Sequence, residues 1–280
     1  MTRIAVTGAG GFVGRYVLEH LRTLDCEIVA AHRTPPQAPA ESTKVRNVQL
    51  DIHEADDAVY ERLGRPDVVI HLAWGGLPNY GSLHHIETEL DAQYRFIKLL
   101  VRGGLKRVVI AGTCFEYGMQ NGELSEQDPC LPNTVYGHAK LTLLRHLQFL
   151  QAAHPFDLTW ARLFYMYGDG QSPKSLYSQF QAAVAKGDGV FPMSGGEQLR
   201  DFLPVATIAS YLGRLALVPG NHGPVNLCSG QPISVRNLVE AWRADAKADI
   251  QLDFGKYPYA SYEPRAFWGN PDRLNRILER

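Results

Sequence analysis

A chain of 280 residues with a formal net charge of −1 offers no broad basic surface for nucleic acid or for an anionic membrane. Hydrophobic residues make up 45% and charged residues 20%, which is typical of a globular protein with a substantial core. The amino terminus lacks the layout of a signal peptide and no apolar run is long enough to span a membrane, so we expect a cytoplasmic protein. The four cysteines show no CxxC spacing, which predicts neither a metal site nor a disulfide framework.

The first predicted unit is a strand, a glycine turn and a helix. Residues 4–6 have the pattern of a buried strand, and an amphipathic helix is predicted over residues 16–24. Between them Gly8, Gly11 and Gly14 follow a GxxGxxG spacing. Such glycines let backbone N–H groups approach a pyrophosphate at a helix N-terminus. An ordinary glycine-rich turn is the alternative, but the flanking elements favour a dinucleotide site.

The end of the second predicted strand, residues 27–31, indicates which dinucleotide fits. An acidic residue there would bind the adenosine ribose hydroxyls, whereas this chain has His32 and Arg33. Positive charge without a carboxylate favours a 2′-phosphate and therefore NADP. A surface arginine without a ligand is the alternative reading. The proline-rich loop at residues 35–39 is expected to be mobile.

The alternation of strands and helices then continues. Strands are predicted over residues 45–50 and 67–73, and helices over 54–63 and 83–101. His71 lies inside an apolar run of the kind buried in parallel sheets, so we assign it to the core and give it no chemistry.

A proton-transfer site is predicted between residues 107 and 140. A strand over residues 107–112 ends on Thr113, and a helix reaching residue 153 begins near Tyr136. Tyr136 and Lys140 are four residues apart and share one helix face. The ammonium and a cationic nicotinamide ring are expected to lower the pKa of Tyr136, so that it can exchange a proton with a carbonyl or an alcohol. A half-buried tyrosine beside a solvated lysine is the alternative, and the glycine turn argues against it.

With a further strand over residues 158–164, these segments make six βα units and predict an α/β fold with a Rossmann-type doubly wound parallel sheet. Beyond Gly168 the pattern becomes irregular, which suits a small C-terminal α/β domain for the substrate. We expect an NAD(P)-binding domain over residues 1–167, with 202–228 contributing. The substrate domain is expected over 168–201 and 229–280.

The glycine motif and the Thr113, Tyr136, Lys140 set, in this order, resemble the extended short-chain dehydrogenases/reductases that act on nucleotide sugars. The segments 162–168 (RLFYMYG) and 200–202 (RDF) are also similar to segments of that family. The resemblance covers the whole chain and implies three groups of site residues. The catalytic group is Thr113, Tyr136 and Lys140. The cofactor-binding group is Gly8, Gly11, Phe12, Val13, Gly14, Arg33, Asp51, Ile52, Leu72, Ala73, Trp74, Tyr136, Lys140 and Phe164. The substrate-binding group is Thr113, Cys114, Phe115, Tyr165, Arg200 and Arg265, and the two arginines would hold the ribose and diphosphate of the nucleotide.

Departures from the family's patterns narrow the reaction. The 4,6-dehydratases have an Asp-Glu pair where this chain has Cys114 and Phe115, so dehydration is not expected. Epimerase-reductases have a cysteine base at the position of Phe115, so epimerisation at carbons 3 and 5 is not expected either. Tyr165 replaces the family's usual asparagine, which leaves open how the sugar is held there.

The segments 74–80 (WGGLPNY), 112–118 (GTCFEYG) and 163–168 are most similar to bacterial reductases of dTDP-4-keto-6-deoxyhexoses in surface polysaccharide biosynthesis. The resemblance therefore implies NADPH-dependent reduction at carbon 4, with NAD(H) as the other possible cofactor. The main alternative is a nucleotide-sugar 4-epimerase that retains NAD. A non-catalytic NADP sensor is a third reading, which the complete proton-transfer set disfavours. The nucleotide base stays open, and family members commonly form homodimers through the helices that Leu83 and Tyr136 begin here.

Overall fold

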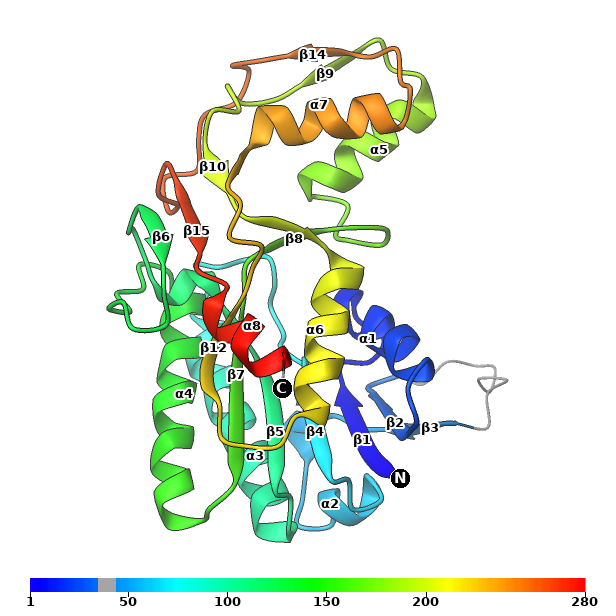
Figure 1. Cartoon of the computed structure of the whole chain (residues 1–280), viewed down its shortest axis with the longest axis vertical. Coiled ribbons are helices and arrows are strands. Elements are labelled where there is room, and N and C mark those ends of the chain that lie inside the picture. The colour runs from blue at the N-terminus through cyan, green and yellow to red at the C-terminus, as the bar shows by residue number, and fades with distance from the viewer. Residues whose placement is uncertain (35–43, 280) are drawn as a thin grey trace.

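A computed structural model describes residues 1–34 and 44–279. Figure 1 shows a larger part built on a sheet and a smaller part above it. In the described residues the large sheet has seven strands, all parallel, in the order β12-β7-β5-β4-β1-β2-β3. These strands are β1 (Thr2–Thr7), β2 (Cys26–His32), β3 (Val45–Gln49), β4 (Val68–His71), β5 (Arg107–Thr113), β7 (Asp157–Leu163) and β12 (Gly223–Leu227).

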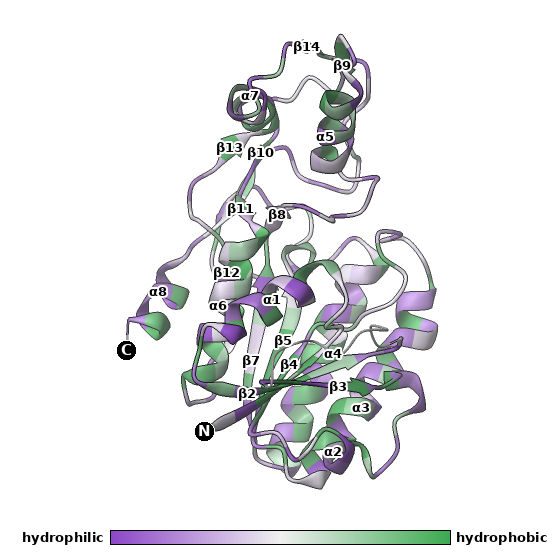
Figure 2. Cartoon of the chain, turned by 90° about the vertical axis from the view of Figure 1, so that its right-hand side faces the viewer, coloured by the Kyte–Doolittle hydropathy of each residue, from purple (hydrophilic) through white to green (hydrophobic). Residues whose placement is uncertain are grey.

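Helices cover both faces of this sheet, as Figures 1 and 2 show. Alternate residues of a strand point to opposite faces, so Ile4 and Val6 of β1 belong to one buried cluster and Ala5 to the other. The first face carries α1 (Phe12–Arg22), α6 (Val205–Leu217) and α8 (Asp272–Leu278). The second face carries α2 (Val59–Arg62), α3 (Leu90–Gly103) and α4 (Val135–Ala153).

The strand order reverses between β1 and β4. In open α/β sheets this switch point leaves a crevice at the carboxyl ends of the strands, where ligands bind. The glycine turn after β1, the loop after β4 and the end of β5 all meet at this edge. The doubly wound Rossmann-type sheet predicted from the sequence is therefore confirmed.

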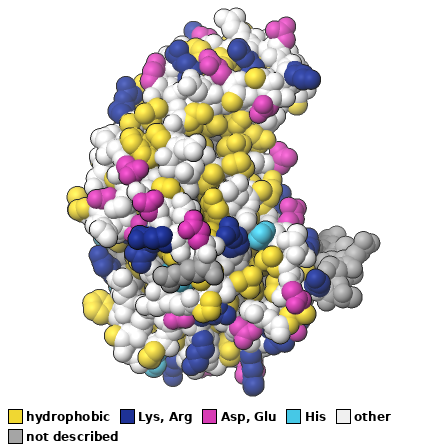
Figure 3. Space-filling view, in the orientation of Figure 1, with side chains coloured by type: hydrophobic (Ala, Val, Ile, Leu, Met, Phe, Trp, Pro, Cys, Tyr) yellow, Lys and Arg dark blue, Asp and Glu magenta, His cyan; other side chains and the backbone are white. Residues whose placement is uncertain are grey.

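The smaller part lies beyond this edge of the sheet and has its own buried cluster, which includes Phe180, Phe191 and Trp242. Its elements are α5 (Leu176–Lys186), α7 (Val235–Asp245), β9 (Val190–Pro192), β14 (Gln251–Asp253), β10 (Leu199–Arg200) and β13 (Ile233–Ser234). Two parallel pairs lie between the parts: β8 (Tyr165–Tyr167) with β11 (Phe202–Pro204), and β6 (Gly122–Leu124) with β15 (Phe267–Gly269). On the face shown in Figure 3, acidic and basic side chains are interspersed.

Several predicted elements differ in the structure. The expected helix over 54–63 is a 3-10 turn, η1 (Ile52–Glu54), followed by the short α2. The expected helix over 83–101 begins with a π-helical turn, η2 (His85–Glu89). β12 adds a seventh strand to the sheet, beyond the six strands of the predicted βα units. α8 packs on the large sheet, although its residues belong to the 229–280 range that was expected to form part of the substrate domain.

The proline-rich loop at 35–39 lies outside the described residues. No helix within residues 1–34 and 44–279 is long and apolar enough to cross a membrane.

Candidate active site

The glycine turn leaves the N-terminus of α1 open at the sheet edge. Gly8 has φ +67°, and a Cβ on it would lie 2.9 Å from the backbone nitrogen of Ala73. Gly11 is the N-cap of α1, and no side chain caps the helix there. The first N–H groups of a helix lack partners within the helix and attract anions. This cradle fits the diphosphate of a dinucleotide, so the residues present suit the expected cofactor.

Two clefts meet at this turn. The first has a volume of about 420 Å³ and lies over the ends of β1, β2 and β3. The predicted residues in its lining are Gly8, Gly11, Arg33, Asp51, Ile52, Leu72, Ala73 and Trp74. Arg33 is exposed at this cleft. The backbone N–H of His53 donates a hydrogen bond to the Asp51 carboxylate, which lowers the pKa of Asp51.

The second cleft, of about 400 Å³, shares Gly8, Gly11, Leu72 and Trp74 with the first. The further predicted residues in its lining are Phe12, Val13, Gly14, Thr113, Cys114, Phe115, Tyr136, Lys140, Phe164 and Tyr165. The structure thus brings together every expected cofactor residue and four of the six expected substrate residues.

The three expected catalytic side chains lie together in the second cleft. Thr113 ends β5, while Tyr136 and Lys140 stand on the first turns of α4. The Thr134 side chain caps this helix by accepting from the backbone N–H of Gly137 at 3.1 Å. All three catalytic candidates are buried. The side chains of Thr113 and Tyr136 are hydrogen-bonded to each other. The Lys140 ammonium donates to the carbonyl oxygen of Ala111 at 2.8 Å.

The expected lowering of the Tyr136 pKa depends on a cationic nicotinamide ring as well as on Lys140, and the protein's own residues have the opposite effect. Burial raises the pKa of Tyr136, because the ring is enclosed by other side chains and a phenolate there would lose its hydration. Burial also lowers the pKa of Lys140, to about 7. Tyr136 is therefore protonated at neutral pH and can act as a proton donor.

Aromatic rings surround Tyr136. The ring centroids of Trp74, Tyr80, His85 and Phe115 lie 5.9, 5.6, 5.2 and 6.5 Å from that of Tyr136. Among the described residues that line the second cleft, Lys140 carries the only charge. Apart from Lys140 the described lining is therefore uncharged and rich in aromatic rings, with polar atoms on Gln171, Tyr80 and Tyr165.

A buried ion pair behind Thr113 was not predicted. Glu116 is fully buried and binds Arg162, with 2.7 Å between the carboxylate oxygen and Nε. The Trp160 indole also donates to Glu116, at 2.8 Å. Glu116 and Arg162 are far apart in the chain, so no local sequence pattern indicated this contact. Burial raises the pKa of the neighbouring Cys114 thiol, so Cys114 is a poor proton donor at the cleft. Glu116 is not among the described lining residues of the cleft.

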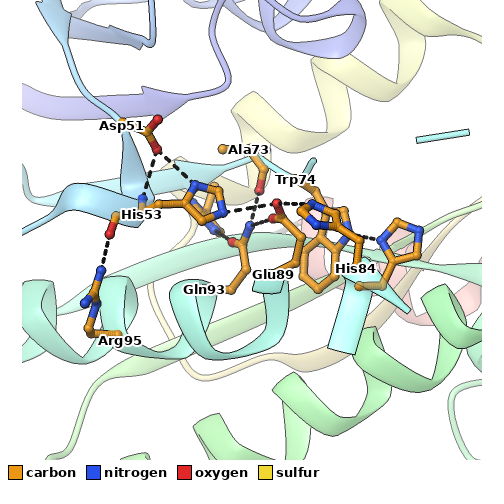
Figure 4. Close-up of polar contacts among 10 residues, drawn as sticks. Asp51, His53, Ala73, Trp74, His84, Glu89, Gln93 and Arg95 are labelled. Atoms are coloured by element: carbon orange, nitrogen blue, oxygen red, sulfur yellow. Dashed lines mark hydrogen bonds and ion pairs between the residues drawn. The ribbon is translucent and has the colours of Figure 1, made fainter. Parts of the chain in front are cut away.

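A polar network, shown in Figure 4, runs under the first cleft from Asp51 through His53 and Glu89 to His84. His53 donates backbone and ring N–H groups to Asp51, and its other ring nitrogen lies 3.1 Å from Glu89. Although burial raises the pKa of Glu89, hydrogen bonds from Gln93 and from the backbone of Gly75 outweigh it and lower the pKa. Glu89 is therefore an ionised carboxylate inside the protein. Its place on a π-helical turn could not be read from the periodicity of the sequence.

His71 is a core residue, as predicted. The Gln93 amide nitrogen donates to Glu89 and to the carbonyl of Ala73, so its oxygen must accept from His71 Nε2. The other ring nitrogen then accepts from the Thr7 hydroxyl at 2.7 Å. Burial lowers the pKa of His71 to about 4, so the ring is neutral.

The two predicted arginines line a separate pocket of about 70 Å³. The Arg200 guanidinium carbon nevertheless lies 5.6 Å from the ring centroid of Tyr165, which lines the second cleft. Arg200 is buried and pairs with Glu263 at 2.9 Å, a contact the sequence did not indicate. Arg265 is exposed, and its guanidinium carbon lies 3.9 Å from the ring centroid of Tyr259. No group of three or more His, Cys, Asp or Glu side chains in the described residues is arranged to hold a metal ion.

Comparisons with known proteins agree with this fold. Residues 4–221 match the model of the NAD dependent epimerase/dehydratase family. A dTDP-6-deoxy-L-talose 4-dehydrogenase (NAD(+)) from Aggregatibacter actinomycetemcomitans is 26% identical over 268 residues, which cover 95% of this chain and 98% of that protein. A dTDP-6-deoxy-L-talose 4-dehydrogenase (NAD(P)(+)) from Kitasatospora kifunensis is 30% identical over 254 residues, covering 85% and 77%.

A solved structure of MoeE5 in complex with UDP-glucuronic acid and NAD matches this fold with a TM-score of 0.83 and 26% identity, covering 99% of this chain and 92% of that one. The resemblance to extended short-chain dehydrogenases/reductases is thereby confirmed. Because the family match spans most of its length, the chain belongs to the NAD-dependent epimerase/dehydratase family.

Proposed function

We propose that the protein uses NADPH to reduce the 4-keto group of a nucleotide-linked 4-keto-6-deoxyhexose, dTDP-4-dehydro-6-deoxyglucose or a close isomer. The observation that carries this proposal is the juxtaposition of Thr113, Tyr136 and Lys140 in a cleft that adjoins the glycine turn. These side chains are sufficient for proton transfer at one carbon, and the described lining of the second cleft adds no carboxylate and no histidine.

The first cleft and the glycine turn would hold the cofactor, which supplies the hydride when bound. The N–H groups at the start of α1 would bind its diphosphate. Arg33 follows the end of β2, where the sequence has no acidic residue, and this supports a 2′-phosphate, although the Asp51 carboxylate at the end of β3 lines the same cleft and interacts with Arg33. One relative is named for NAD(+) and another for NAD(P)(+), so the phosphate preference is part of the proposal.

Tyr136 would donate its proton to the oxygen that becomes the carbon 4 hydroxyl. Burial keeps Tyr136 protonated, which suits the reducing direction. Thr113 would hydrogen-bond the same oxygen and hold it beside the phenol. Lys140 would replace part of the lost hydration of the tyrosinate and bind the nicotinamide ribose.

The second cleft has a lining rich in aromatic rings, with no charge other than that of Lys140 among the described residues, and this supports a 6-deoxy sugar. A methyl group at carbon 6 can be buried against Phe115 and Tyr80 without an unsatisfied hydroxyl. A carboxylate at that position would have no cation other than Lys140 among the described lining residues. Elimination also needs a carboxylate at the cleft, and no Asp or Glu is among its described lining residues. The buried Glu116 behind Thr113 is bound to Arg162.

For the nucleotide half we propose Arg200 and Arg265, since guanidinium groups match phosphate geometry. Two relatives act on dTDP sugars by name, which supports thymidine as the base. We also propose a homodimer through α3 and α4, because Phe149 on α4 is 77% exposed. Sedimentation of the wild type and of Phe149→Lys would test the dimer.

A 4-epimerase is the second candidate. The same three side chains can oxidise and re-reduce carbon 4, and the matching family model covers epimerases by name. Retained NAD and the absence of net cofactor turnover would characterise that reaction.

The proposed function is tested by incubating the protein with NADPH or NADH and dTDP-, GDP-, CDP- or UDP-linked 4-keto-6-deoxyhexoses. Loss of absorbance at 340 nm measures reduction, and NMR of the product gives the configuration at carbon 4. We expect turnover that is fastest with NADPH and a dTDP sugar. Failure of every keto sugar to oxidise the cofactor would contradict the proposal.

A further inference from the structure

Trp74 follows β4 and lines both clefts, where it makes a close contact with Lys140. The Lys140 ammonium nitrogen lies 3.8 Å from the centroid of the Trp74 ring. The same indole meets Tyr136 edge-on, with an interplanar angle of 78°. A cation over the face of tryptophan is attracted by the ring quadrupole, and this attraction grows when the cation is removed from water.

The indole is fixed by a hydrogen-bond chain that does not involve Lys140. Trp74 Nε1 donates to His85 Nδ1 at 3.1 Å, so that ring nitrogen is an acceptor. A neutral imidazole then carries its proton on Nε2, which lies 2.8 Å from the carbonyl oxygen of Asn79 and donates to it. His85 is fully buried at the start of the π-helical turn η2. The tautomer of His85 therefore sets the direction of the indole N–H.

The backbone on either side of Trp74 is also held, as Figure 4 shows for one side. The carbonyl of Ala73 accepts from the Gln93 amide at 3.0 Å. On the other side, the backbone of Gly75 is hydrogen-bonded to the buried carboxylate of Glu89. Backbone and indole are thus both anchored to the segment that carries η2 and α3.

In the described part of the chain, the buried Lys140 ammonium has few groups that can stabilise its charge apart from the Trp74 ring. Lys140 is 3% exposed, and its ammonium donates a hydrogen bond to the carbonyl of Ala111. Two carboxylates, Glu116 and Glu89, favour the charged form of Lys140. Glu116 is already bound to Arg162. Glu89 is already bound to His53, His84 and Gln93. His71, which also faces it, is neutral. The indole face is therefore a direct stabilising contact of the ammonium.

We infer that Trp74 is a positioning residue that holds the Lys140 ammonium, through a cation–π contact, where it acts on Tyr136. This inference rests on the proposed function for what Lys140 does in the reaction. The contact itself can be measured without any substrate.

The substrate-independent experiment follows the titration of Lys140 by NMR of protein labelled with ¹³C-lysine, with Lys140→Met to assign the signal. Wild type, Trp74→Phe and Trp74→Leu are compared, with Trp268→Phe as a control because Trp268 lines neither cleft. We expect Trp74→Leu to lower the pKa of Lys140 by about half a unit to one and a half units. Trp74→Phe should lower it less, and Trp268→Phe should not change it.

Fluorinated tryptophans placed at position 74 remove the π attraction with little change in ring shape. The pKa of Lys140 should fall stepwise as fluorines are added, which answers the question even if Trp74→Leu does not fold. An unchanged titration across the fluorinated series would overturn the inference.

The kinetic experiment connects the contact to the reaction. If the pKa of Lys140 falls by one unit from about 7, the ammonium fraction at pH 7 falls from about one half to about one tenth. We therefore expect kcat of Trp74→Leu at pH 7 to fall about fivefold and to recover below pH 6, whereas Trp74→Phe should retain most activity. A loss of kcat that is the same at every pH would contradict the positioning role. If the wild type reduces no keto sugar, the proposed function fails while the NMR result still decides the contact.

Discussion

The carboxylate of Glu116 accepts a hydrogen bond from the backbone N–H of Thr113 at 2.9 Å. The same residue lies at the third position of the short turn η3 (Cys114–Glu116), and the Thr113 side chain caps this turn by accepting from Phe115 at 3.3 Å. Each residue thus fixes the other in a reciprocal capping box. The hydroxyl that faces the second cleft is held in place by a carboxylate that does not reach the cleft itself.

This relationship predicts a structural role for Glu116. Glu116→Gln keeps the shape of the side chain but leaves the buried Arg162 without its anion, which typically costs about 3–5 kcal/mol. Urea unfolding should show this loss, and the exposed Glu19→Gln serves as control. A loss below about 1 kcal/mol would show that the pair contributes little.

Tyr136→Phe removes the proposed proton donor and keeps the ring that packs against Trp74, Tyr80 and Phe115. We expect kcat to fall about 100- to 10,000-fold, because a placed side chain typically contributes that much to proton transfer. Cofactor affinity and the melting temperature should persist. Thr113→Val should cost less, since it removes a hydrogen bond and no proton. Turnover of Tyr136→Phe within about threefold of the wild type would mean that the proton comes from elsewhere.

Arg33→Asp tests the cofactor preference. If Arg33 binds the 2′-phosphate, the variant should weaken NADPH by about thirtyfold and leave NADH much less affected, since such a contact is worth on the order of 2 kcal/mol. Fluorescence titration of both cofactors gives the ratio. Arg22→Asp is a suitable control, because Arg22 is exposed on α1 and lines neither cleft. An unchanged NADPH to NADH ratio would remove Arg33 from the site.

The two proposed nucleotide contacts should behave differently. Arg265 is exposed, so Arg265→Ala should raise KM for the sugar nucleotide with little change in kcat or stability. Arg200→Ala should raise KM too, but it also leaves the half-buried Glu263 without its partner and should lower the melting temperature. Steady-state kinetics and thermal unfolding separate these effects. A KM that is unchanged in Arg265→Ala would place the nucleotide elsewhere.

The pH dependence follows from Lys140. Its pKa is lowered to about 7 by burial, so the ammonium is present below that pH and is lost as the pH rises through it. The rate of ketone reduction at saturating substrate should therefore decline from about pH 7 upward. A flat profile of kcat to pH 9 would contradict a role for the charged form.

The sequence predicted the parts of the site that depend on local pattern. Strand, glycine turn and helix identify Gly8, Gly11 and Gly14, and parallel strands end at one edge, so Thr113 was expected near Tyr136 and Lys140. The contacts between distant segments had no such signal. Trp74 with Lys140, Glu116 with Arg162 and Glu263 with Arg200 depend on packing in three dimensions. The rise that burial gives to the Tyr136 pKa had no signal for the same reason, because the rings of Tyr80 and Phe115 enclose Tyr136 only in the folded protein.

Transfer of deuterium tests the central claim most directly. The protein is incubated with NADPH that carries deuterium at the transferable position and with dTDP-4-dehydro-6-deoxyglucose, and the product is analysed by NMR and mass spectrometry. A 4-ketoreductase predicts one deuterium at carbon 4 for each cofactor oxidised. A parallel incubation replaces the keto sugar by a 4-hydroxy sugar nucleotide. Its conversion to the carbon 4 epimer, without deuterium and without net oxidation of NADPH, together with no reduction of the keto sugar, would contradict the account and identify an epimerase.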